Sequence, residues 1–405
     1  NLSNFWSIGA AGGFEYSDSQ ILFRKAKDFV DDLESDIKTG STRVLNQKIN
    51  LSQENKIYYP SLSKMNLNKS SCKIISEIGL NHNGSSELAK ELIIESKKAG
   101  ADFVKFQLYD PEKRASSKIR DSFYSEVSDG EGENLHEIFL DCFLDFETLS
   151  ELKIFTDKVG IEMFLSAFDK ESVYKASILN PSKLKISSMD LTNKEVWEEA
   201  IKHFKTIFAS TGMSSIDEVK RSFDYANSTG KKIDINLLHC VSAYPMPLEE
   251  ANLGRMNLLR NISQNVGYSD HSISIEIPFA AALMGAQVIE KHFTLDKSLK
   301  GPDHIHSASP KELSKLCELV SSLPNIVGGE SGVISKIQKK EMMKQKKGYF
   351  FTKDLEAGEI LHRDHMKIGA PCLGADTFEC FELIGLELKI KVLENQPINK
   401  NQFIK

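Results

Sequence analysis

Residues 73–107 read KIISEIGLNHNGSSELAKELIIESKKAGADFVKFQ, and this stretch decides the fold. Its two ends, residues 73–78 and 102–106, are short runs rich in β-branched and aromatic residues, which favour strands. Between them, residues 86–99 show the apolar spacing of an amphipathic helix. A strand, a helix and a second strand in this order predict two parallel strands joined by a crossover helix.

The same alternation continues to about residue 324. Six further short β-branched runs follow the first two, at residues 161–165, 183–186, 206–209, 234–238, 265–268 and 287–290. Helical patterns lie between most of them, for example at residues 146–158 and 193–204. Eight such units in about 250 residues predict an α/β fold of the (β/α)8 TIM-barrel type. A doubly wound open sheet is the alternative, but no Gly-x-Gly-x-x-Gly motif follows the first strand to favour it.

The flanking segments differ in composition from the predicted barrel, which we place at residues 71–325. Residues 1–70 form an extension of unknown role, with one amphipathic helix predicted at residues 20–37 that we interpret as a packing appendage. Residues 326–347 are a Lys-rich linker, and residues 348–405 read as a small β-rich domain with several turn signals. Within the barrel, the polar, acidic stretch 109–140 predicts a long solvated loop.

Composition narrows the function. The 405 residues carry 51 Lys and Arg against 57 Asp and Glu, a net charge of −6, which argues against a nucleic-acid partner held by a basic field. No apolar run approaches the ~20 residues of a membrane helix, so we expect no membrane association. The first residues lack the basic start of a secretion signal. The six cysteines are scattered and form no C-x-x-C pair, so the sequence predicts neither a zinc site nor a dense disulfide framework. A cytoplasmic location is the simplest expectation.

Polar residues follow every predicted strand, and in a barrel all these strand ends meet at one face, where active sites form. One cation and several hydroxyl donors among them suit a small ligand with a phosphate and a carboxylate. These residues are Lys185, Ser188, Ser210, Ser242 and Ser269.

Two histidines and one glutamate at strand ends suggest further chemistry. His271 and His292 end successive strands and could together hold a divalent metal that leaves positions open for a carbonyl substrate. Glu77, at the end of the first strand, is a general base or a partner of a metal-bound water. The structural alternative for Glu77 is an ion pair with Lys105 or Lys185.

At these residues the chain resembles the sialic acid synthase family of N-acetylneuraminate, legionaminate and pseudaminate synthases. Members condense phosphoenolpyruvate with an N-acyl-mannosamine-type sugar to make a nonulosonic acid. The matching motifs cover residues 72–325 and are EIGLNHNG at 77–84, AGADFVKFQ at 99–107, KISS at 185–188, STGM at 210–213, LHCVSAYP at 238–245, GYSDH at 267–271, EKHFT at 290–294 and GPDH at 301–304. The tail, with KDLEAGE at 353–359 and LIG at 383–385, resembles the antifreeze-like (SAF) domain that ends such synthases.

The resemblance implies a role for each matching residue. Lys185 and the serines Ser188, Ser210, Ser242 and Ser269 are implied to bind phosphoenolpyruvate, with Lys105 nearby as a further catalytic residue. His271 and His292 are implied to hold Mn²⁺ or Mg²⁺. Gln107, Tyr244 and Asp303 are implied to contact the sugar, and Glu77 and Asp190 to act in acid–base steps. A homodimer is also implied, in which the SAF domain caps the partner's active site.

The chain departs from the family pattern in places. Ser242 stands where Asn is frequent, Asp190 stands where Glu is usual, and residues 166–168 read Ser-Ala-Phe in place of the start of Ser-Thr-Pro-Phe. In bacterial members the SAF domain often supplies an Arg, but residues 368–371 read Ile-Gly-Ala-Pro. Polar residues near that point that could replace it are His362, His365 and Lys367.

Two other functions remain open at the level of sequence. One is a different phosphoenolpyruvate-condensing barrel, of the class that makes 3-deoxy sugar acids from pentose or tetrose phosphates; the SAF-like tail argues against it. The other is a non-catalytic carbohydrate-binding protein, which the complete set of polar strand ends argues against. The sequence leaves the identity of the sugar, and whether it is phosphorylated, undecided.

Overall fold

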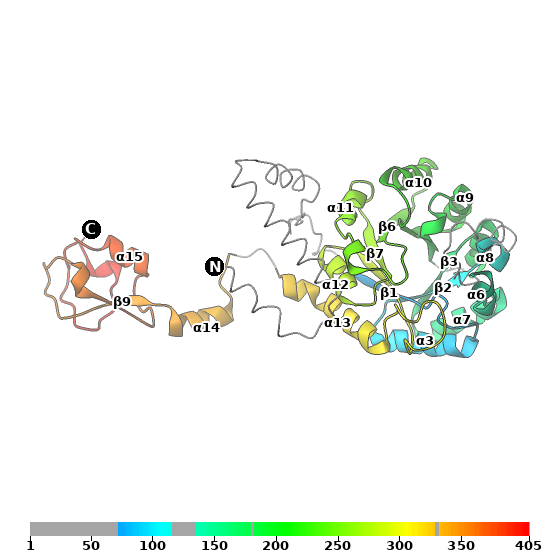
Figure 1. The fold of residues 1–405 in the computed structure, drawn as a ribbon. Coiled ribbons are helices and arrows are strands. Elements are labelled where there is room, and N and C mark those ends of the chain that lie inside the picture. Colours follow the sequence, from blue (N-terminus) through cyan, green and yellow to red (C-terminus); the bar gives the residue numbers. More distant parts are fainter. Residues whose placement is uncertain (1–71, 116–134, 180–181, 329–331, 405) are drawn as a thin grey trace, which may run out of the picture. The chain divides into compact units, whose positions relative to one another are not determined.

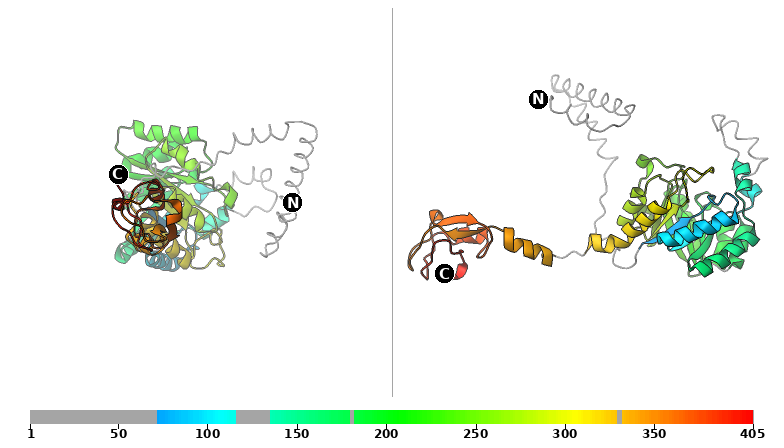
Figure 2. Two further views of the ribbon diagram at one scale, coloured as in Figure 1. Left: turned by 90° about the vertical axis from the view of Figure 1, so that its left-hand side faces the viewer. Right: turned by 90° about the horizontal axis from the view of Figure 1, so that it is seen from below.

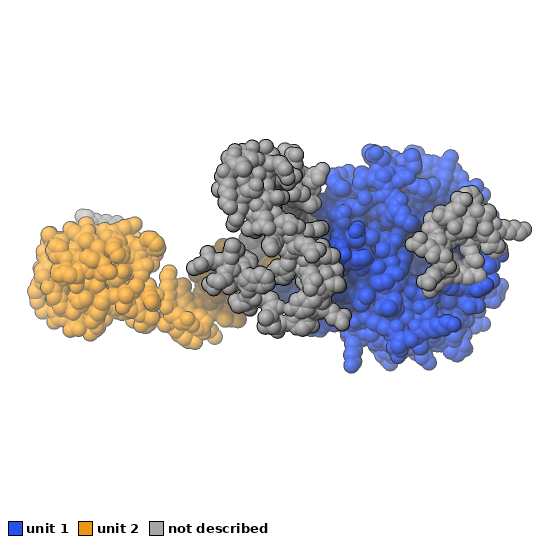
Figure 3. All heavy atoms as spheres, in the orientation of Figure 1, with its two compact units in different colours: residues 1–326 blue, residues 327–405 orange. Residues whose placement is uncertain are grey.

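The structure is a computed structural model that describes residues 72–115, 135–179, 182–328 and 332–404. The predicted helix at residues 20–37, like the whole N-terminal extension at residues 1–70, lies outside the described residues. The chain divides into two compact units, residues 1–326 and 327–405 (Figure 3), and each is described by itself.

The first unit is a closed barrel of eight parallel strands, which confirms the predicted (β/α)8 fold. β1 pairs with β2 on one side and with β8 on the other, and this second pairing closes the ring. Helices surround the strands (Figure 1). The strands are β1 Lys73–Glu77, β2 Phe103–Leu108, β3 Glu162–Ala167, β4 Lys183–Ile186, β5 Thr206–Ser210, β6 Asp234–Cys240, β7 Val266–Asp270 and β8 Val288–His292.

The helices begin and end where local chemistry dictates. Helix α3 (Ser86–Ala99) starts after Ser85, whose side chain accepts a hydrogen bond from the Leu88 amide, and ends at Gly100 with a φ of 94°. The other helices of the unit are α4 Pro111–Arg114, α6 Leu135–Asp141, α7 Phe146–Val159, α8 Lys170–Ile178, α9 Lys194–His203, α10 Ile216–Ser228, α11 Arg255–Arg260, α12 Glu276–Leu283 and α13 Pro310–Val327.

The strands have two buried faces, as parallel strands in a barrel must. One set of alternate residues packs outward against the helices and belongs to the main hydrophobic core. The other set faces the interior, where a separate apolar cluster forms. We call this cluster the apolar layer; it consists of Ile75, Phe103, Phe164, Phe208, Leu238 and Val288. Because side chains alternate along a strand, the residue two positions later faces the interior as well.

The stretch after β2 differs from the predicted solvated loop. Where the structure describes it, short helices α4 and α6 flank the segment, and Tyr109 is only 4% exposed. The Tyr109 ring packs against Phe139 at 5.6 Å and Phe168 at 6.1 Å between ring centroids. The prediction was wrong at these ends because the aromatic residues are spaced too widely to form a visible apolar run.

The second unit has a small core of its own, around residues such as Phe351, Leu361 and Leu388. β9 (Gly348–Phe351) pairs antiparallel with β10 (Met366–Gly369), and α15 (Thr377–Glu382) follows. The Lys-rich segment expected to be a linker carries helix α14 (Lys336–Gln345), all of whose side chains are exposed. Among the described helices, none combines the length and the hydropathy needed to cross a bilayer.

Candidate functional site

Four charged side chains lie inside the barrel, directly beyond the apolar layer. Glu77, Lys105, Lys185 and Glu290 are each at most 4% exposed. Lys105 Nζ is 2.7 Å from Glu77 Oε2 and 3.8 Å from Glu290 Oε2. Lys185 Nζ is 3.3 Å from Glu290 Oε1. Two ammonium groups and two carboxylates balance in charge, which is how buried ions are tolerated.

Hydroxyl groups complete this ring of charges. Lys105 Nζ donates to Ser166 Oγ at 2.6 Å, and Ser269 Oγ donates to Glu290 Oε1 at 2.9 Å. Most members follow a residue of the apolar layer by two positions, so both sets face the interior. We call the second set the polar layer; it consists of Glu77, Lys105, Ser166, Lys185, Ser210, Cys240, Ser269 and Glu290.

The two carboxylates of the polar layer have different proton affinities. Burial raises the pKa of Glu77, although Lys105 opposes the effect. Burial would also raise the pKa of Glu290, but Lys105 and Lys185 together hold it at about 2. Two neighbouring carboxyl groups whose pKa values are pushed apart are typical of acid–base chemistry. Glu77 is therefore the candidate proton carrier, and Glu290 stays ionised.

Two serine hydroxyls, those of Ser188 and Ser242, lie against Gly212, and Ser210 stands two residues before it at the end of β5. The Gly212 amide donates to Ser188 Oγ at 3.1 Å. A Cβ atom at Gly212 would lie 2.4 Å from Ser242 Oγ and 2.8 Å from Ser188 Oγ, so any larger residue there would displace these two hydroxyls. Ser210 Oγ is buried, and no described residue forms a hydrogen bond with it. A buried hydroxyl without a partner is costly unless a ligand receives its proton, and an anion would.

Three imidazole rings meet beside the polar layer. His271 lies 5.3 Å from His292 and 6.1 Å from His306, and His292 lies 5.0 Å from His306, between ring centroids. His271 Nδ1 donates to the Val241 carbonyl oxygen at 3.0 Å, and this leaves Nε2 as a lone-pair donor. The structure thus brings together the two histidines predicted to bind metal.

The carboxylate of Asp303 lies against the same rings. Its Oδ2 is 3.5 Å from His292 Nδ1, and its Oδ1 is 3.9 Å from His306 Nε2. One ligand atom from each of these three residues lies within 4.8 Å of the others. Gly79, with a φ of 55°, leaves room for them, since a Cβ there would be 3.2 Å from both Asp303 Oδ2 and His292 Nδ1.

The chemistry of this group fits a divalent metal. Within the described part of the chain, His292 Nδ1 and both nitrogens of His306 are buried without a hydrogen-bond partner. Burial lowers the pKa of His292 well below its usual range and that of His306 to about 3, so both rings stay neutral. Metal ligands must be unprotonated, and unpartnered buried nitrogens are otherwise unfavourable. The pKa of Asp303 is raised to about 6 by burial and by Glu77.

The other predicted site residues differ in their surroundings. Gln107 Nε2 donates to Glu77 Oε1 at 2.8 Å, and the Tyr244 ring lies 4.4 Å from that of His271 between centroids. Both residues therefore border the charged ring or the imidazoles. Asp190 accepts hydrogen bonds from Ser187 and Asn193 within its own turn, the short helix η3 (Ser188–Asp190).

Sequence reasoning gave no role to three residues of this region. Glu290 stands two residues before His292 in the same strand, and that spacing places both inside the barrel. His306 stands two residues after His304 in a loop, where no periodic pattern applies. Arg114, in α4, places its guanidinium carbon 3.5 Å from the Phe168 ring centroid, while its Nε and Nη1 are buried and form no hydrogen bond with any described residue.

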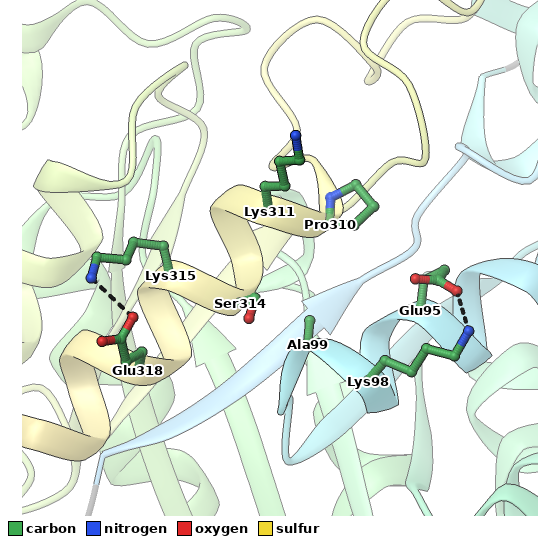
Figure 4. A pocket seen from close by; sticks show the side chains of 8 residues that line it. All are labelled: Glu95, Lys98, Ala99, Pro310, Lys311, Ser314, Lys315 and Glu318. Atoms are coloured by element: carbon green, nitrogen blue, oxygen red, sulfur yellow. Dashed lines mark hydrogen bonds and ion pairs between the residues drawn. The ribbon is translucent and has the colours of Figure 1, made fainter.

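A hollow of about 420 Å³ lies elsewhere, on the outside of the barrel, and is lined by residues of α3 and α13 (Figure 4). Figure 2 shows these two helices next to each other on the outside of the barrel. Two of the lysines that line the hollow are paired within their own helices, Lys98 with Glu95 and Lys315 with Glu318. It shares no residue with the polar layer or the imidazole group. We regard it as an ordinary surface groove.

Comparison with known proteins gives consistent results. The model of the NeuB family matches residues 92–331. The chain is 35% identical to the N,N'-diacetyllegionaminic acid synthase of Campylobacter jejuni, over 77% of this chain and 94% of that protein. It is 32% identical to the N-acetylneuraminate-9-phosphate synthase of Drosophila melanogaster, over 82% and 95%. A crystal structure of the N-acetylneuraminic acid synthetase of Leptospira borgpetersenii in complex with citrate matches with a TM-score of 0.59 and 32% identity, over 67% of this chain and 90% of that one.

Proposed function

The chain belongs to the NeuB family, and from this premise we propose that it is a nonulosonic acid synthase. It condenses phosphoenolpyruvate with an N-acyl-mannosamine-type sugar and releases phosphate, as a transferase. The observation that carries the proposal is the polar layer, in which two ammonium groups and two carboxylates lie beside a cluster of three imidazoles. The family match favours this function over a 3-deoxy sugar acid synthase and over a non-catalytic carbohydrate-binding protein.

The polar layer binds phosphoenolpyruvate in this proposal. Lys185 and Lys105 supply positive charge, and the hydroxyls of Ser188, Ser210 and Ser242 donate to the phosphate or carboxylate oxygens. Lys185 is now held by Glu290 at 3.3 Å, and an arriving anion competes with that carboxylate. Ser269 also bonds Glu290 and could turn toward the ligand.

The reaction needs one carbon–carbon bond, one added water and one lost phosphate. C3 of phosphoenolpyruvate attacks the aldehyde carbon of the open-chain sugar, the C=O π electrons move to the aldehyde oxygen, which takes up a proton to become a hydroxyl, and positive charge develops at C2. Water adds at C2 and gives up a proton, for which Glu77 is the proposed acceptor, and Gln107 holds the Glu77 carboxylate in place. The tetrahedral intermediate then expels phosphate by cleavage of the C2–O bond, and Lys185 stabilises the departing charge. We keep Asp190 as a second acid–base candidate.

The imidazole group is the proposed metal site, with His271 and His292 as ligands and Mn²⁺ or Mg²⁺ as the ion. Such an ion, when bound, polarises and orients the sugar aldehyde. Tyr244 and Asp303 border this site and are proposed to contact the sugar.

The C-terminal unit is proposed to be an SAF domain that caps the partner's site in a homodimer, in the cytoplasm. Of the three residues proposed to replace the missing Arg, His365 is buried within its own unit and Lys367 Nζ lies 3.4 Å from Glu394 Oε1. His362 is exposed and remains the best candidate.

Phosphate release from phosphoenolpyruvate tests the function. The purified chain is assayed with N-acetylmannosamine, its 6-phosphate and diacetamido-trideoxyhexoses, and with arabinose 5-phosphate and erythrose 4-phosphate as controls. We expect release with at least one N-acyl sugar and none with the two controls. Release only with the sugar phosphates that lack an N-acyl group would assign the chain to the 3-deoxy sugar acid class.

A further inference from the structure

Two histidines of one loop, His304 and His306, have opposite surroundings. His304 Nδ1 is hydrogen-bonded to Thr294 Oγ1 at 2.7 Å, and its Nε2 donates to Asn83 Oδ1 at 3.2 Å. Both nitrogens of His304 therefore serve the fold, by tying this loop to the loop after β1. His306 is 0% exposed, yet neither of its ring nitrogens has a hydrogen-bond partner among the residues that the structure describes.

The backbone of His306 is fixed although its ring is unpartnered. Lys291 Nζ, itself fully buried and 2.6 Å from Asp270 Oδ2, donates to the His306 carbonyl oxygen at 3.1 Å. This contact holds the residue against β8, so its ring lies beside His292, Asp303 and Tyr244. A buried polar ring that is held in place and left without partners is expected to have a ligand.

We propose that His306 is a third imidazole ligand of the metal site, alongside His271 and His292, with Asp303 as the neighbouring carboxylate. The inference rests on the proposed function insofar as that function places a divalent metal here. One ligand atom from each of His292, Asp303 and His306 lies within 4.8 Å of the other two. His271 stands at the end of the neighbouring strand β7, and its Nδ1 is bonded to a backbone carbonyl, which leaves Nε2 for the metal.

A site with three imidazoles selects among metals. Imidazole nitrogen suits Zn²⁺ and other later transition metals such as Co²⁺ better than Mg²⁺, which prefers oxygen ligands and retains its waters. The third histidine therefore shifts the site away from Mg²⁺ and toward the transition metals.

Metal binding to the full chain, stripped with a chelator, tests this without an activity assay. Isothermal titration with Co²⁺ and with Mg²⁺ compares the intact protein with His306→Leu and His306→Asn, and with His304→Asn as the matched control from the same loop. Loss of a residue that only hydrogen-bonds a metal ligand typically weakens metal binding by about tenfold or more. Loss of a direct ligand should weaken Co²⁺ binding by at least that factor. Mg²⁺ binding should change less, and His304→Asn should leave Co²⁺ affinity within about threefold.

A second measurement uses the intact protein and does not depend on whether a variant folds. Pulsed EPR of the Mn²⁺-loaded chain detects directly bound imidazole nitrogens, and we expect three. Two nitrogens, or an unchanged Co²⁺ affinity in His306→Leu, would overturn the proposal. If His271→Ala loses the metal while His306→Leu keeps it, the proposed function stands and the role of His306 fails. If the intact chain binds no metal, both the role of His306 and the proposed metal site fail.

Discussion

The same strands contribute residues to both the apolar layer and the polar layer of the barrel interior. In each of these strands the polar residue comes two positions after the apolar one. Phe164 and Ser166 share β3, Phe208 and Ser210 share β5, and Val288 and Glu290 share β8. The apolar layer is tightly packed: a Cβ at Gly267 would lie 2.5 Å from Val288 Cγ1. The polar layer has groups without partners, such as Ser210 Oγ. The apolar layer therefore stabilises the fold, while the polar layer has hydrogen-bonding groups that can bind a ligand.

The largest effect should come from the imidazoles that border the polar layer. His271→Ala removes a proposed metal ligand, and because a metal supplies several kcal/mol of charge stabilisation, kcat should fall by roughly 10³-fold or more. Thermal unfolding should change little. Steady-state kinetics and calorimetry check both, and full activity in excess EDTA would contradict the metal role.

The apolar layer should show the reverse behaviour. Phe164 is fully buried, with its ring 5.5 Å from that of Phe208 between centroids, so Phe164→Ala leaves a cavity. We expect the free energy of unfolding to drop by about 3–5 kcal/mol. Urea titration measures the loss, and kcat per folded molecule should stay near the native value. A variant that is stable but inactive would show that the two layers are not separable in this way.

Two lysines of β4 offer a matched pair for a smaller effect. Lys185→Ala removes a charge-assisted contact worth about 1.5–3 kcal/mol, so the KM for phosphoenolpyruvate should rise far more than that for the sugar. Lys183, two residues earlier, pairs with Glu162 at 2.7 Å and lies 4.8 Å from the Phe103 ring centroid, at the other end of the interior. Lys183→Ala should leave both KM values unchanged. An equal rise of both KM values in Lys185→Ala would remove Lys185 from the anion site.

The smallest expected effect concerns the second unit. Deletion of residues 348–405 should lower kcat or sugar affinity by roughly tenfold, about 1.4 kcal/mol, because a cap excludes water and orients the substrate. The barrel has its own core and should remain folded. Kinetics and sedimentation of the truncated and full-length chains check this. Unchanged kinetics, or a full-length chain that is active as a monomer, would refute the capping proposal.

Sequence reasoning predicted the barrel because short runs of aliphatic and aromatic residues alternate with helical patterns, most of them amphipathic, and this alternation depends only on neighbours in the chain. It also predicted which strand-end residues converge, since barrel topology brings those ends together. It did not decide whether Glu77 pairs with Lys105 or with Lys185. In the structure Glu77 pairs with Lys105, while Lys185 pairs with Glu290. These choices depend on side-chain packing across the barrel.

Residues in loops were the hardest to predict. His306 lies beyond β8, in a segment without helical or strand periodicity, so nothing in its spacing indicated that it would meet His292. The helices α4 and α6 were not predicted for a related reason: tertiary contacts of Tyr109 with Phe139 and Phe168 support them. In both cases the deciding contacts are between residues far apart in the chain.

The central claim is that the polar layer condenses phosphoenolpyruvate with an N-acyl sugar by cleavage of the C2–O bond. Phosphoenolpyruvate labelled with ¹⁸O at the bridging oxygen, incubated with the full chain, Mn²⁺ and the N-acyl sugar that supports turnover, tests it by mass spectrometry of both products. We predict that the label leaves in the phosphate and that the nine-carbon acid contains none of it. Label retained in the acid would mean that the P–O bond breaks and would contradict the account.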